Sequence, residues 1–145
     1  MSMYPVIAAV IGRLVANNGI STAVGSRVYA EARAQDGALP CIIVAISEDE
    51  SRPGLVPAAS TLRKAEVELM VVALTAKQAN EIAELIRASL HEAVSWTATV
   101  GGASIHVLHS LHSRSLTNYQ PPSAGESTGA FTHSSMYSIM YQRTT

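Results

Sequence analysis

The sequence predicts an α+β domain in which two main helices pack on a largely antiparallel sheet. Short β-branched runs bounded by turn signals are typical of strands, and two other stretches carry apolar residues at helical spacing. They occur in the order helix, strands, helix, strands, which indicates helices laid on a sheet. The length of 145 residues fits a single domain with one core, spanning residues 1–145.

A first helix is predicted near the N-terminus. Its apolar residues at helical spacing are Val6, Ile7, Val10, Ile11 and Leu14. Pro5 is tolerated in a first helical turn, and Asn18-Gly19 predicts the C-terminal stop. Arg13 interrupts the apolar stretch, no basic region precedes it, and no segment approaches ~20 apolar residues. We therefore expect a soluble protein of intracellular origin, without a secretion signal or a membrane span.

Two strands are expected next. Residues 26–30 favour a short strand, and a turn at Gln35-Asp36-Gly37 then leads to an apolar run from Cys41 to Ile46. This run predicts a strand over about 41–47 that is buried on both faces. Cys41, the lone cysteine, is expected to be a buried, inert thiol.

Residues 48–62 predict a long projecting loop, because the segment holds three consecutive acidic residues, two prolines and a glycine. Such a loop is either a contact arm or an idle solvated segment, and the residues leave both readings open. The segment 64–75 then predicts a central strand, since its charged and apolar residues alternate before it becomes wholly apolar.

A second helix is predicted to begin at Ala76. Thr75 and Gln78 form a capping-box pair, in which each side chain satisfies a free backbone N–H. The predicted buried stripe consists of Ala79, Ile82, Ala83, Ile86 and Leu90.

The C-terminal third predicts two more strands. Gly101-Gly102 breaks the chain, residues 103–115 favour a strand, and residues 118–129 read as a polar Pro/Gly loop. In the final segment alternate residues are larger, which predicts a half-buried strand. The residues expected on one face are Phe131, His133, Ser135, Tyr137, Ile139 and Tyr141, with small polar residues and methionines on the other.

No constellation of residues predicts catalysis. The segment 125–129 matches G-x-S-x-G, but no Asp or Glu follows Ser127, as the hydrolase pattern requires. On a strand, His106 and His112 would point to one face and His109 to the other, so the three could not share a metal ion. We expect no enzyme activity, no catalytic residues, no cofactor and no metal.

The charge content indicates assembly. The formal net charge is -1 and the charged fraction is 14%, against about 25% for typical soluble domains. After Glu92 the only charged residues are Arg114, Glu126 and Arg143. A surface with so few charges predicts that part of it is covered by copies of the chain or by partners. A monomer with a Ser/Thr-rich face would fit the same composition. The scattered Lys and Arg argue against a nucleic-acid binder.

The order of features resembles the tail-completion, or tail-terminator, family of long-tailed bacteriophages and prophages. The family pattern V-G-x-R-(I/V)-Y, a Gly-x-x-Pro turn and a strand ending in Ile-Ser are matched, and so are the Thr-x-x-x-Ala entry and the Arg-x-x-Leu end of the second helix. The matching residues are Val24, Gly25, Arg27, Val28, Tyr29, Gly37, Pro40, Ile46, Ser47, Thr75, Ala79, Arg87 and Leu90. Ala30 and Cys41 depart from it, where the family commonly has a proline and an aromatic residue.

The resemblance implies a ring of about six subunits at the head-proximal end of the tail tube, at the head–tail junction of a virion assembled in the host bacterial cytoplasm. Its implied partners are its own copies, the tail tube protein and a head-completion or connector protein. DNA would pass through the lumen without specific binding, so we expect a near-neutral or acidic lumen.

The expected contact elements are the 48–62 loop and the sparsely charged segment 113–135. The candidate contact residues are Glu48, Asp49, Glu50, Arg52, Arg63, Lys64 and Arg114. Three alternatives stay open: a head-completion stopper, a tail tube subunit, which would form open-ended polymers, and, more remotely, a small intracellular enzyme.

Overall fold

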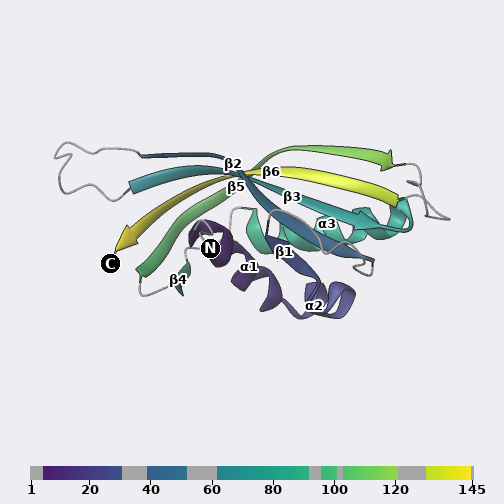
Figure 1. Cartoon of the computed structure of the whole chain (residues 1–145), viewed down its shortest axis with the longest axis horizontal. Coiled ribbons are helices and arrows are strands. Elements are labelled where there is room, and N and C mark those ends of the chain that lie inside the picture. The colour runs from purple at the N-terminus through teal and green to yellow at the C-terminus, as the bar shows by residue number, and fades with distance from the viewer. Residues whose placement is uncertain are drawn as a thin grey trace.

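A six-stranded sheet with three helices on one of its faces forms the architecture (Figure 1). The computed structural model describes residues 5–30, 39–51, 62–91, 96–100, 103–120 and 130–144. The elements are α1 (Pro5–Val15), α2 (Asn18–Val24), β1 (Val28–Ala30), β2 (Cys41–Ser51), β3 (Leu62–Ala73), α3 (Ala76–Leu90), β4 (Trp96–Val100), β5 (Ala103–Gln120) and β6 (Ala130–Thr144). The strand order is β1-β2-β3-β6-β5-β4. Only the short β1 pairs in parallel, so the predicted α+β class with a largely antiparallel sheet is confirmed.

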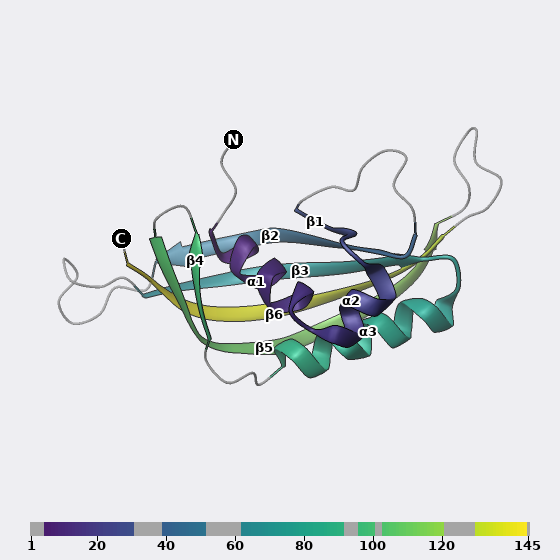
Figure 2. The same cartoon turned by 90° about the horizontal axis from the view of Figure 1, so that it is seen from below.

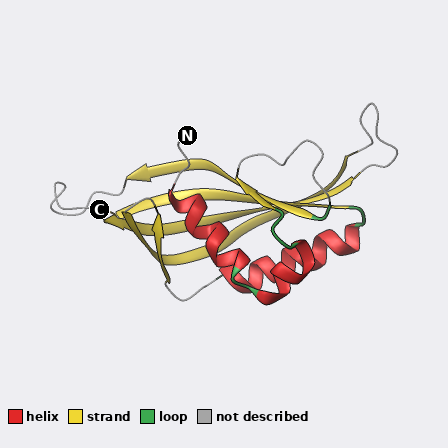
Figure 3. Ribbon diagram, turned by 60° about the horizontal axis from the view of Figure 1, so that its bottom comes forward, coloured by secondary structure: helices red, strands yellow, loops and turns green. Residues whose placement is uncertain are grey.

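The helices all lie on the same side of the sheet. Figure 2 shows α1 and α3 across the face that the viewer meets first, and Figure 3 shows the same layering with the strands behind the helices. No described helix covers the opposite face. We call these the helix face and the open face of the sheet.

The core lies between the helices and the helix face. Side chains alternate along β3 and β6, so one residue in two is buried against the helices. The alternating buried residues on these two strands are Ala65, Val67, Leu69, Val71, Ala73, Ser135, Tyr137, Ile139 and Tyr141. Val72 and Thr132 are buried as well, outside this alternation. The expected alternation of the last strand is therefore confirmed from Ser135 onward, while Phe131 and His133 are partly exposed.

Helix α3 matches its prediction. It spans Ala76–Leu90, and the five residues of the predicted stripe are all buried. The Thr75 hydroxyl accepts a hydrogen bond from the Gln78 backbone N–H at 3.1 Å, which satisfies one of the free donors of the first turn. Local signals suffice here, because the cap and the apolar stripe both lie within the helix itself.

The N-terminal region departs from its prediction. Asn18-Gly19 does not end the helical region: α1 ends at Val15, and Asn18 opens a second helix that the sequence reading missed. Asn17 is its N-cap, and its Oδ1 accepts from the Ile20 N–H at 3.0 Å. Among the described residues no single helix has the length and hydropathy to cross a membrane, and α1 with α2 meets these criteria only as a pair bent by 90°.

Gly25 and Arg27 join α2 to the sheet. Gly25 has φ of 60°, a conformation that favours glycine, and its N–H donates to the Ser21 carbonyl to close the helix. Arg27 Nε donates to the Pro40 carbonyl at 2.8 Å, and the Ile42 N–H donates to the Arg27 carbonyl at 3.0 Å. These two bonds fix the parallel start of β1 against β2.

Strand β2 is longer and more exposed than predicted. Cys41, Ile42 and Val44 are buried and Cys41 forms no disulfide within the described residues, but Ile43 and Ala45 on the open face are only partly buried. The strand also continues to Ser51, and β3 begins at Leu62. The predicted 48–62 loop is therefore wrong at both ends, because an acidic stretch remains in the ladder after a β-bulge between Ile46 and Glu48. Its residues 52–61 lie outside the described residues.

The C-terminal hairpin extends further than predicted. β5 runs from Ala103 to Gln120, so the predicted loop 118–129 begins in a strand, and its residues 121–129 lie outside the described residues. The sequence reading also missed β4, whose Trp96 helps to hold α1. Arg13 of α1 places its guanidinium carbon 5.0 Å from the Trp96 ring centroid, and its Nε donates to the Ser89 carbonyl of α3.

Candidate contact surface

The open face of the sheet is the candidate contact surface. Along β2, β3, β6 and β5 it presents partly or fully exposed side chains of mixed character. They include Ile43, Lys64, Glu66, Glu68, Met70, Leu111, Arg114, Leu116, Ser134, Met136, Ser138 and Met140. Methionine, serine and leucine outnumber the four charged residues of this set, which is unusual for a sheet face that no described helix covers.

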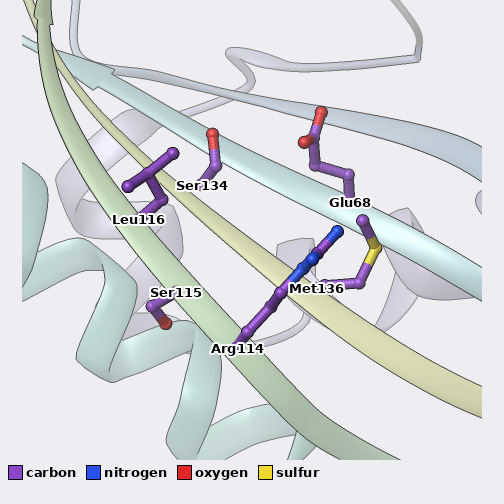
Figure 4. Close-up of a pocket in the computed structure, with 6 residues that line it drawn as sticks. All are labelled: Glu68, Arg114, Ser115, Leu116, Ser134 and Met136. Carbon is purple, nitrogen blue, oxygen red and sulfur yellow. The ribbon is translucent and has the colours of Figure 1, made fainter.

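A shallow hollow of about 410 Å³ lies on this face, over β3, β6 and β5 (Figure 4). Its lining residues are Glu68, Arg114, Ser115, Leu116, Ser134 and Met136. Figure 4 shows the Arg114 side chain extending from β5 toward Met136 and Glu68. The hollow thus combines one positive and one negative side chain with two serines and the apolar side chains of Leu116 and Met136.

Arg114 reaches the open face because of a β-bulge. The register of β5 against β6 shifts between His112 and Arg114, so that His112 lies opposite Tyr137 and Arg114 lies opposite Met136. Without the bulge the two residues would share a face, since side chains alternate with a period of two. The extra residue, Ser113, donates from its hydroxyl to the Met136 carbonyl at 3.0 Å.

The predicted contact residues separate into three groups. Glu48, Asp49 and Glu50 lie in β2, opposite Glu66, Ala65 and Lys64 of β3, so the ladder brings this acidic stretch beside Lys64. Arg63 follows on β3, opposite Tyr141 of β6. Arg114 lies two strands away from β3, in the hollow. Arg52 lies outside the described residues, and so does the G-x-S-x-G segment.

Lys64 has an ion-pair partner within its own strand. Its Nζ lies 3.5 Å from Glu66 Oε1, and the two side chains are 32% and 24% exposed. A pair so open to water contributes only about 0–1 kcal/mol, so it leaves Lys64 able to exchange partners. Whether a neighbouring chain supplies acidic partners for Arg63 and Lys64 stays a prediction.

The three histidines of β5 do not divide as predicted. A bulge between Val107 and His109 puts His106 and His109 on the open face, opposite Gln142 and Met140, and leaves His112 on the helix face. The expected pairing of His106 with His112 is therefore wrong, because periodicity cannot reveal an inserted residue. His106 Nδ1 lies 2.8 Å from Thr97 Oγ1 of β4. Within the described ranges no group of three or more His, Cys, Asp or Glu could hold a metal ion.

Sequence reasoning missed one feature of this surface, the exposed apolar side chains of β5. Leu111 is 41% exposed, Leu116 is 69% exposed and Tyr119 is 48% exposed. The signal was present in the very low charge after Glu92, but it did not indicate which residues would be exposed. Leu111 and Leu116 lie on the open face and form an apolar strip along β5 beside the hollow, whereas Tyr119 lies opposite Phe131 and therefore on the helix face.

Comparisons with known proteins place this architecture among virion components. The family model described as "Tail completion protein gp17" matches residues 8–121, from α1 to the end of β5. A chain of the solved "Virion of native gene transfer agent (GTA) particle" is similar in fold, with a TM-score of 0.61 and 11% sequence identity over 99% of this chain and 100% of that chain. At such low identity the likeness concerns the fold alone. The comparison with curated proteins gives no match.

Proposed function

Because this chain belongs to the family of the tail completion protein gp17, we propose that it forms the terminator ring of a phage-type tail. It is a structural component of the tail, and its place is in the virion. The ring, of about six subunits, would sit on the head-proximal end of the tube, end polymerisation there and offer a surface to head-completion proteins. We infer that this role is structural and needs no catalysis.

The open face is the observation that carries the ring proposal. Covering a sheet face that has an apolar strip and few charges costs little free energy of desolvation. In a closed ring each subunit uses two different surfaces, one for each neighbour. The open face would be one of these surfaces or the surface that meets the tube.

Charged residues would set the register of this association. Arg63, Lys64 and Arg114 on one side and Glu48, Asp49, Glu50 and Arg52 on the other are the proposed contacts. Exposed ion pairs contribute little to affinity, but like charges brought face to face oppose a wrong register. Apolar contacts of Leu116 and Met136 would supply most of the binding free energy.

DNA is proposed to pass through the ring without being held. A net charge of -1 per chain gives no overall attraction to the phosphate backbone. We therefore expect weak, strongly salt-dependent DNA binding. Tight binding of the assembled ring to duplex DNA at physiological salt would contradict a near-neutral or acidic lumen.

A tube-capping assay tests the proposal directly. Purified chain is added to polymerising tail tube protein, and tube length and decoration are measured by electron microscopy. A terminator shortens the tubes and is found as a ring at one end of each tube. A tube subunit would instead be incorporated along the tubes or polymerise alone, and a head-completion stopper would leave tube length unchanged.

The matched variants for this assay are Leu116→Asp and Leu74→Asp. Both replace an exposed leucine, 69% and 55% exposed, but Leu74 lies in the connection between β3 and α3, outside the open face. We expect Leu116→Asp to reduce capping and Leu74→Asp to leave it unchanged. Equal loss in both variants would contradict a role of the open face.

A further inference from the structure

A second hollow, of about 280 Å³, lies on the helix face between α3 and the strands β5 and β6. Most of its lining residues carry a polar or charged group, in contrast to the aliphatic core beside it. The lining residues are Ala83, Glu84, Arg87, His112, Ser115, His133, Ser135 and Tyr137. Neither the fold nor the proposed assembly accounts for so many polar side chains converging under a helix.

Tyr137 provides the key observation. Its side chain is 0% exposed, and its hydroxyl has no hydrogen-bond partner among the described residues. A buried hydroxyl that lacks a partner is costly, so a group that accepts its proton in a hydrogen bond would be stabilising. Burial raises the pKa of Tyr137 to about 12, so the hydroxyl remains a donor throughout the neutral range.

Hydrogen bonds hold the neighbouring side chains in place. His112 Nε2 lies 2.6 Å from Ser115 Oγ, which lies 3.4 Å from Ser135 Oγ. His133 Nδ1 lies 3.1 Å from Asn80 Oδ1 of α3. The same Nδ1 lies 3.2 Å from Thr117 Oγ1 of β5, so groups on two elements hold the His133 ring. The hollow is thus lined by ordered hydroxyl and imidazole groups.

The charges around the hollow favour an anion when the histidines are protonated. Arg87 and Glu84 of α3 cancel one another formally, so the uncharged state of the imidazoles leaves little net charge. Burial lowers the pKa of His112, and the charge of Arg87 lowers it further. Burial also lowers the pKa of His133, which Glu84 partly opposes. An anion in the hollow would favour protonation of both rings.

We propose that this hollow binds a single oxyanion group through the Tyr137 hydroxyl, the Arg87 guanidinium and the imidazoles of His112 and His133. Hydroxyl, guanidinium and imidazolium groups all donate, and a carboxylate or a tetrahedral oxyanion is the ligand that accepts from several donors at once. The group is either a free ion or the carboxylate of an acidic side chain on a partner protein. The site lies on the helix face, whereas the ring proposal is argued from the open face.

The proposal includes a defined dependence on pH. The titratable or charged groups around the hollow are Glu84 and Arg87 on α3, His91 directly after α3, His112 on β5, and His133 and Tyr137 on β6. As the pH falls through the pKa values of His112 and His133, which lie below the ordinary histidine pKa of about 6.5, protonation adds positive charge beside Arg87. Affinity for an oxyanion therefore increases as the pH falls from 8 to 5.5.

Calorimetric titration of the purified full chain with sodium sulfate tests the site, at constant ionic strength set with chloride. Sulfate keeps its charge across this pH range, so a change of affinity reports on the protein. We expect saturable binding that strengthens by about tenfold from pH 8 to pH 5.5. His133→Gln should flatten this pH dependence. Absence of saturable binding at pH 5.5 would overturn the proposal and would mean that the hollow holds water and no anion.

Three variants separate this site from general charge effects. Arg87→Gln and Lys77→Gln each remove one positive charge from α3, but Lys77 is 87% exposed, pairs with Glu81 and does not line the hollow. Arg87→Gln and Tyr137→Phe should each weaken sulfate binding about tenfold, while Lys77→Gln should not. Equal weakening by Lys77→Gln would show non-specific attraction and overturn the site.

The melting temperature of the Tyr137→Phe variant shows whether a loss of sulfate binding comes from misfolding. Since the hydroxyl has no described partner, its removal should leave the melting temperature without sulfate unchanged or higher. The wild type should gain melting temperature with sulfate, and the variant should not. A lower melting temperature of the variant without sulfate would contradict the unpartnered hydroxyl, and the same gain with sulfate in both proteins would contradict its role in binding.

The source of the oxyanion is decided by two further probes. Acetate stands for the free ion, and the peptide SEDES, which corresponds to residues 47–51 of this chain, stands for a carboxylate carried by a protein. A partner's side chain is indicated if the peptide binds more tightly than both acetate and sulfate and its amide counterpart SQNQS does not bind. Tighter binding of sulfate than of the peptide indicates a free tetrahedral ion. Either result leaves the tube-capping test of the ring unaffected.

Discussion

The two faces of the sheet differ in what their residues do. Leu69 and Met70 are neighbours on β3, yet Leu69 is fully buried against the helices and Met70 is partly exposed on the open face. The same contrast holds on β6 between Ile139 and Met140. The helix face is built for packing, whereas the open face carries flexible, weakly polar side chains of the kind that adapt to a partner. Stability and assembly should therefore respond to different substitutions.

The largest expected effect is on stability. Leu69→Ala should lower the free energy of unfolding by about 2–5 kcal/mol, because it leaves a cavity under the helices. Met70→Ala, one residue along the strand, should cost much less, because its side chain is still in contact with water. Urea unfolding followed by circular dichroism measures both. Similar losses in the two variants would show that the open face is packed as the helix face is.

The next effect concerns association. Leu116→Asp should weaken self-association by about 1–3 kcal/mol, since it places a charge in the apolar strip, and it should leave the unfolding free energy nearly unchanged. Sedimentation velocity over a concentration series measures the association, with Leu74→Asp as the control. Unaltered association of Leu116→Asp would remove the apolar strip from the interface.

A smaller effect, again on stability, is expected where α2 joins the sheet. Gly25→Ala should destabilise the fold by about 1–2 kcal/mol, because a side chain disfavours its φ of 60°. The added Cβ would meet only Arg27 Nη1 at 3.7 Å, an ordinary contact, so the cost comes from the backbone. Thermal unfolding measures it, and Gly12→Ala, at a helical position with nothing within 4 Å of the added Cβ, is the stabilising or neutral control.

The smallest expected effect is the pH dependence of stability that arises from the histidines of the helix face. The pKa values of His112 and His133 are lowered in the fold, so the unfolded chain binds more protons at mildly acidic pH. Stability is then fully present above the ordinary histidine pKa of about 6.5 and decreases as the pH falls through the lowered values. Unfolding free energies from pH 8 to 5 measure this, and His133→Gln should flatten the slope. A rise in stability on acidification would contradict the direction of both shifts.

The sequence predicts most reliably where the signals are local. α3 carries its own cap and stripe, so its start and its buried face followed from residues 75–90. The second helix was missed because Asn18-Gly19 is typical of a helix end, whereas Asn17 caps a new helix whose Ile20 and Val24 are buried by tertiary packing. A weak local propensity does not show such packing in advance.

The contact surface was harder to predict than the fold. Two bulges in β5 determine which histidines share a face and bring Arg114 to the hollow, and no periodicity reveals an inserted residue. The polar hollow under α3 brings together Arg87, His112 and His133, which are far apart in the sequence. The low fraction of charged residues predicted that a partner surface exists, but the sheet topology determines where that surface lies.

The molar mass of the purified chain in solution tests the central claim most directly. Light scattering over a concentration series, with and without tail tube protein, compares the mass with that of one 15.3 kDa chain. The account predicts a closed ring of about six chains, or a monomer that becomes such a ring only on tube ends. A monomer or dimer that is stable at every concentration and indifferent to tubes would contradict it.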